Sequence, residues 1–128
     1  MAQFAKHFTL AEANAMLPQI RAIFEQIAAL RAQLAERQGD LALVHRAAPG
    51  NGGDPNGSEL VIQSETIGRL LHELEQNGVI VQDPEAGIID FPHIRDGEEI
   101  FLCWRSGEES VSHWHHLDTG FRGRKPIT

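Results

Sequence analysis

The sequence predicts an α+β fold, in which two amphipathic helices form an antiparallel hairpin that packs against a small C-terminal antiparallel β-meander. Two observations predict it. On both sides of the stretch 47–57, between Thr9 and Asn77, apolar residues recur every three or four positions, as they do on one face of a helix. From Val79 onward the apolar runs are short and are separated by turn residues, as in a sheet of short strands.

The first helix begins at Thr9, because the Thr9 hydroxyl can accept from the Glu12 amide while the Glu12 carboxylate accepts from the Thr9 amide. Pro18 lacks an amide donor and costs about 3 kcal/mol inside a helix, so we expect a kink or a break near Leu17. Arg31 interrupts the apolar stripe of this helix. The stripe consists of Leu10, Ala13, Leu17, Ile20, Phe24, Ile27, Leu34 and Leu41, and it is widened on one flank by Met16, Ile23 and Leu30.

The stretch 47–57 is rich in glycine and proline and has no periodicity, which predicts a flexible connector. Ser58 then caps a second helix, which ends at Asn77-Gly78 because glycine readily adopts the left-handed conformation that follows a helix. Two amphipathic helices joined by a loop are expected to form a hairpin, here over 9–77. The apolar stripe of the second helix is Leu60, Ile67, Leu70, Leu71 and Leu74.

The β-rich part, 79–118, is followed by a C-terminal tail, 119–128, and the 128 residues suit one domain of ordinary size. Turn residues such as Asp83-Pro84 and Asp96-Gly97 separate the expected strands. These strands are Val79–Gln82, Ile88–Phe91, Glu99–Trp104 and Ser110–His115.

Composition excludes several classes of function. The formal net charge of -7 argues against a nucleic-acid binder, because such binding needs clustered Lys and Arg to neutralise phosphates. No apolar run approaches the roughly 20 residues of a membrane-spanning helix, so we expect no membrane partner. A single cysteine and the absence of a secretory signal predict a cytoplasmic location.

Three blocks of the sequence resemble one family. They are F-T-L-A-E-A-N-A-M-L-P, E-L-E-Q-N-G-V-I-V-Q-D-P-E-A-G-I-I-D-F-P, and L-C-W-R-S-G-E-E with H-W-H-H-L-D-T-G-F-R-G-R-K-P. In this order they resemble the bacterial and archaeal domain-of-unknown-function family 2203, over nearly the whole chain apart from the connector. The resemblance implies a cytoplasmic domain and no catalytic activity that can be assigned.

The strand Ser110–His115 carries the strongest candidate site. Side chains alternate along a strand, so Val111, His113 and His115 are expected on one face, and Ser112, Trp114 and His116 on the other. Two histidines in this arrangement suit one divalent metal, zinc or similar, although an H-x-H pattern also fits one buried hydrogen-bonding imidazole beside solvated ones. The candidate ligands are His113, His115, His116, Glu108 and Asp118, with His93, Asp90 and Cys103 as further sources of a third ligand.

Other residues have a chemical and a structural interpretation. Cys103 could pair with His113 or His115 as a nucleophile, but a lone cysteine between apolar strand neighbours is typical of a core. Arg122 and Arg124 could bind an anionic group, although composition alone slightly favours a solvated tail.

The leading hypothesis is therefore a small-ligand or divalent-metal-binding module with its site on the His113/His115 strand. The alternative is a non-catalytic protein that self-associates or acts as an adaptor through its helices. We expect a homodimer, because the first helix is longer than the second and part of its apolar face lacks a cover within the chain.

Overall fold

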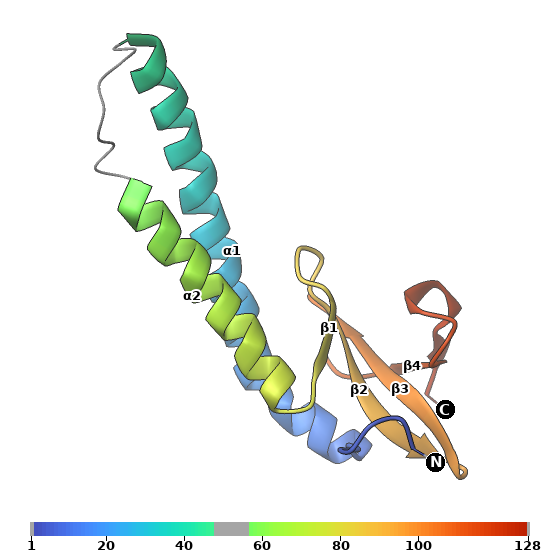
Figure 1. Ribbon diagram of the computed structural model, residues 1–128. Helices are drawn as coiled ribbons and strands as arrows, with labels where there is room; N and C mark the ends of the chain where they lie inside the picture. Colours follow the sequence, from blue (N-terminus) through green and yellow to red (C-terminus); the bar gives the residue numbers. More distant parts are fainter. Residues whose placement is uncertain (1, 48–56, 128) are drawn as a thin grey trace.

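The computed structural model describes residues 2–47 and 57–127, without the side chains of residues 37–60. Two helices, α1 (Leu10–Ala47) and α2 (Gly57–Gln76), precede a five-stranded sheet (Figure 1). The strands are β1 (Ile80–Asp83), β2 (Ile88–Arg95), β3 (Glu98–Arg105), β4 (His113–His116) and β5 (Lys125–Pro126). This confirms the predicted α+β fold. The predicted connector, apart from its end residues 47 and 57, lies outside the described residues. The predicted cap at Ser58 depends on a side chain that is outside the described ones.

The first helix begins as predicted, with the Glu12 carboxylate 2.9 Å from the Thr9 amide and the Thr9 hydroxyl 3.0 Å from the Glu12 amide. It does not break at Pro18, because α1 runs without interruption from Leu10 to Ala47. Apolar side chains on both sides of Pro18, among them Leu17 and Ile20, are buried, and their burial offsets the missing hydrogen bond. The first turns of α1, blue in Figure 1, lie at an angle to the rest.

The second helix ends where the sequence predicts. Gly78 has φ 90°, and the amide of Val79 donates to the Leu74 carbonyl at 3.1 Å. This left-handed residue reverses the chain into β1, and Leu74 is buried against α1 and the sheet.

No helix within residues 2–47 and 57–127 is long and apolar enough to cross a membrane.

The sheet is an antiparallel meander with the strand order β1-β2-β3-β4-β5. Asp96 and Gly97, with φ 50° and 79°, form the two-residue turn that joins β2 to β3. β2 extends four residues beyond its predicted end, through Pro92. Proline is accommodated there because β1 pairs with β2 only between Ile88 and Asp90, so Pro92 needs no amide for that neighbour.

The helices cover one face of the sheet (Figure 1). The sheet side chains that pack against them are Ile89, Phe91, Ile100, Leu102 and Trp104, as the alternation in β3 predicts. Val111 also belongs to this core, which corrects its expected place beside His113 and His115. The strand begins only at His113, so the period-two pattern does not extend back to Val111.

The C-terminal segment is not a solvated tail. A single turn of 3-10 helix, Phe121–Gly123, leads into β5, which pairs with β4 through His113 and Trp114.

The N-terminal segment lies over the sheet on the side to which Glu99 points. The Glu99 carboxylate accepts hydrogen bonds from the amides of Gln3 and Phe4 at 2.7 and 3.0 Å. The sheet is therefore covered on both faces.

Candidate functional site

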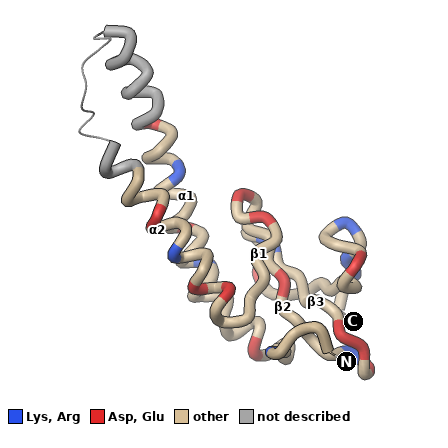
Figure 2. The backbone as a smooth tube through the Cα atoms, viewed as in Figure 1, with Lys and Arg blue, Asp and Glu red and all other residues tan. Residues whose placement is uncertain are grey.

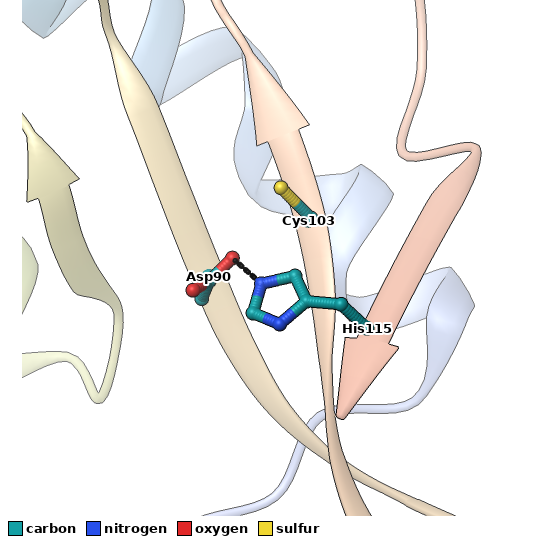
Figure 3. Close-up of side chains that lie close together, drawn as sticks. All are labelled: Asp90, Cys103 and His115. Atoms are coloured by element: carbon teal, nitrogen blue, oxygen red, sulfur yellow. Dashed lines mark hydrogen bonds and ion pairs between the residues drawn. The ribbon is translucent and has the colours of Figure 1, made fainter. Parts of the chain in front are cut away.

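Three neighbouring strands place an aspartate, a cysteine and a histidine together on the sheet face turned away from the helices (Figure 3). Asp90 of β2 lies opposite Cys103 of β3, and His115 of β4 lies opposite Phe101, two residues along β3. One donor atom from each of the three residues lies within 4.8 Å of the others. Asp90 and Cys103 are 0% exposed and His115 is 1% exposed, so the group is closed to solvent.

Both ring nitrogens of His115 face hydrogen-bond acceptors. Nδ1 lies 2.7 Å from the main-chain oxygen of His116 and must carry a proton, because a carbonyl oxygen only accepts. Nε2 lies 3.0 Å from Oδ1 of Asp90. Burial by itself lowers the pKa of His115, but hydrogen bonds to Asp90, Cys103 and the His116 carbonyl, with the Asp90 charge, raise it to about 10. Asp90 and His115 thus form a buried ion pair.

The surroundings orient each of these side chains. The second oxygen of Asp90 accepts from Nε2 of Gln82 at 2.8 Å. The ring of Phe101 packs edge-on against His115 at 5.4 Å, and Phe4 from the N-terminal segment packs on Phe101 at 5.3 Å. The carboxylate, the imidazole and the thiol therefore lie in a dry and well-fixed environment.

An arginine and a glutamate close the site next to the cysteine. Nη1 of Arg124 lies 3.8 Å from Cys103 Sγ and 3.0 Å from Glu108 Oε1, and Nη2 also donates to Glu108. Burial raises the pKa of Glu108, but the bonds from Arg124 and the Arg105 amide outweigh it and hold this pKa below its usual value. The ion pair fixes the segment before β5 over Cys103.

The sequence-predicted site residues are separated by the structure. His115 enters the buried group, while His113, opposite Cys103 in the register, bonds through Nδ1 to the Ser112 hydroxyl at 2.9 Å. Glu108 lies 3.7 Å from Nδ1 of His113. His116 pairs with Glu98 at 3.1 Å on the other side of the strand, and the remaining candidates Asp118 and Arg122 are exposed. Metal binding by these residues stays a prediction.

The nucleophile interpretation of Cys103 meets a physical obstacle. A reactive thiol needs access to its substrate, and Cys103 has no exposed surface. Three donors of the oxygen, sulfur and nitrogen type in one buried cluster suit metal coordination better than attack on an external substrate. From the sequence, Asp90 and Cys103 are only further candidates, since their approach to His115 depends on the register between β3 and β4.

Comparison with curated proteins and with solved structures finds no match. The family comparison does find one, and it covers nearly the whole chain, including all three residues of the buried group. Residues 6–127 match the family described as uncharacterized conserved protein (DUF2203), and the protein belongs to that family.

Proposed function

We propose that the protein is a divalent-metal-binding module whose ion is held by Asp90, Cys103 and His115. The observation that carries this proposal is the meeting of three ligating side chains from three strands, with donor atoms within 4.8 Å of one another. Ligands of a zinc ion at bond lengths of about 2.0–2.3 Å lie within such distances of each other.

The hydrogen bonds around the group support this proposal. A metal-bound histidine usually donates its second ring N–H to a carbonyl or carboxylate, as Nδ1 of His115 does to the His116 carbonyl. This bond leaves Nε2 directed at Asp90 as the ligating atom. Gln82 holds the outer oxygen of Asp90 in the same way and leaves the inner oxygen for the ion.

The charge balance also supports it. Metal binding requires a thiolate and a neutral imidazole, so uptake of a dication releases the thiol proton of Cys103 and the imidazolium proton of His115. The metal replaces two protons, and the buried group keeps the same net charge. Such an exchange avoids an uncompensated charge in a solvent-free site.

The ligand types favour zinc or a similar ion over calcium and magnesium, which prefer oxygen ligands. His113 is our candidate for the fourth ligand. It lies opposite Cys103 on β4, on the same face as His115, and its Nε2 makes no hydrogen bond among the described residues. Rotation about its side-chain bonds would release it from Ser112 and Glu108.

The first experiment is elemental analysis of protein purified without a chelator or an affinity tag. We expect about one zinc or similar ion per chain, and an affinity for added zinc at least tenfold weaker in Cys103→Ser and His113→Ala. The matched control is His116→Ala, which removes an imidazole from the other face of the same strand and should leave the affinity unchanged. Metal far below one equivalent, with no uptake of added zinc or manganese, would contradict the proposal.

A second candidate function is self-association through the helical hairpin. Val61 and Ile62 are adjacent in α2 and are each 57% exposed, in turns that lie beyond the sheet (Figure 1). The same apolar patch on a second copy is a suitable partner, because a two-fold interface brings identical surfaces together. We therefore infer a homodimer as its assembly.

Light scattering coupled to size-exclusion chromatography tests this dimer. We expect twice the chain mass for the native protein and the mass of one chain for a Val61→Glu/Ile62→Glu variant, because charges in an apolar interface are strongly unfavourable. Ile94→Glu is the matched control, since Ile94 is 43% exposed but lies on the sheet. A monomer in concentrated native samples would exclude this candidate.

A further inference from the structure

A groove runs along α1 on the helix side of the sheet, away from the Asp90 group. Two cavities of about 320 and 440 Å³ adjoin here and share Phe24, Ala28 and Ser106 as lining residues. The other wall is formed by the turn between β1 and β2 and by the turn after β3. Each cavity has a volume within or near the range that small-molecule sites occupy.

One end of the groove combines apolar side chains with a guanidinium group. Arg31 lines the smaller cavity together with Phe24, Ile27 and Ala28. It is half-buried and donates through Nη1 to the main-chain oxygen of Pro84 at 3.2 Å. Among the described residues no carboxylate pairs with it. Its charge and its other N–H donors are therefore available to a ligand.

Arg31 also explains an irregularity of the sequence. It occupies a position on the apolar stripe of α1, where a structural role alone would favour an aliphatic residue. The acidic residue that shares its cavity, Glu85, is exposed on the β1–β2 turn, where Figure 2 shows acidic residues. Water screens the charge of Glu85 more than that of the half-buried arginine.

The opposite end of the groove has different chemistry. Arg21 donates there to the main-chain oxygens of Glu108 and Glu109. The larger cavity is also lined by Trp104 and by three glutamates, Glu25 among them. The exposed carboxylates of Glu25 and Glu109 disfavour an anion there. Phe24 and Trp104 line this end with aromatic side chains that are almost wholly buried, at 7% and 1% exposed. The groove thus has a positively charged end at Arg31 and an acidic end at Glu25 and Glu109.

We propose that this groove binds a small organic acid with an apolar body, and that Arg31 holds the acid group. The planar guanidinium matches a carboxylate or sulfonate through paired N–H donors. The apolar body lies along Phe24 and Ala28 toward Trp104. This site lies on the other face of the sheet from Asp90, Cys103 and His115, and it does not depend on metal binding.

Two fluorescent probes with the same aromatic body test the proposal. Anilinonaphthalene sulfonate carries an acid group, and N-phenyl-1-naphthylamine lacks it. We expect the native protein to bind both, and Arg31→Gln to weaken sulfonate binding about tenfold or more with little effect on the neutral probe. Arg31→Lys, which keeps the charge, should lose less than Arg31→Gln.

Matched variants complete the experiment. Arg69→Gln removes an exposed arginine of α2 that lines neither cavity, and it should leave sulfonate binding within about twofold of native. Ala28→Phe fills the shared part of the groove and should abolish binding of both probes. Circular dichroism and urea unfolding verify that every variant is folded under the assay conditions. No binding of the sulfonate by native protein, equal binding by Arg31→Gln, or undiminished binding by Ala28→Phe would each overturn the proposal.

Discussion

Replacing Asp90 with alanine is expected to lower the free energy of unfolding of the metal-free protein by about 3–5 kcal/mol, because the change leaves a buried charge or polar group unpaired. The partner, His115, is 1% exposed and bonds to Asp90 at 3.0 Å. Gln82 loses its acceptor in the same variant. Urea unfolding at neutral pH in the presence of a chelator measures the difference.

The same variant has a pH signature. The pKa of His115 is raised from 6.5 to about 10, so its contribution to stability is complete below pH 6.5 and is lost as the pH rises through about 10. Asp90→Ala should remove most of this decline. Asp118→Ala is the matched control, since Asp118 is exposed and should change stability by less than about 0.5 kcal/mol. Equal losses for the two variants would exclude the buried ion pair.

Replacing Trp104 with alanine is expected to cost about 3–5 kcal/mol of stability. The indole is 1% exposed, packs near Phe24, and donates through Nε1 to the Glu108 carbonyl at 3.0 Å. Trp104→Phe keeps most of the volume and should cost less, since it removes mainly one hydrogen bond.

Thermal and urea unfolding measure the stability of these two variants and of Trp114→Ala. The comparison separates the stability contributed by a tryptophan packed in the core from that of a tryptophan at the surface. Trp114 is only half-buried and is flanked by Arg95 and Lys125, at 4.5 and 5.4 Å from its ring. We expect a smaller loss for Trp114→Ala than for Trp104→Ala. The reverse order would show that the core does not depend on Trp104.

The helices could be predicted from the sequence because their signals are local. The Thr9/Glu12 capping pair and the spacing of apolar residues each involve positions three or four apart, and both are present in the structure. The short strand β5 gave no such signal. Its two residues, Lys125 and Pro126, are held by pairing with β4 and not by their own propensity.

The candidate site could be predicted only in part, for reasons of register. The Asp96-Gly97 turn fixes the Arg95–Glu98 pair, and counting back along both strands puts Asp90 opposite Cys103. This part was accessible from the sequence. The connection 106–112 between β3 and β4 contains no such short turn, so the position of His115 opposite Phe101 depends on tertiary packing.

Glu108 connects α1, the groove and the surroundings of Cys103. Its main-chain oxygen accepts from Arg21 of α1 and from Trp104, while its carboxylate holds Arg124 beside Cys103. It also lines the larger cavity of the groove. A displacement of Glu108 would therefore change contacts on both faces of the sheet. Because coupling free energies are reciprocal, any effect of an occupied groove on metal affinity must equal the effect of the metal on affinity in the groove.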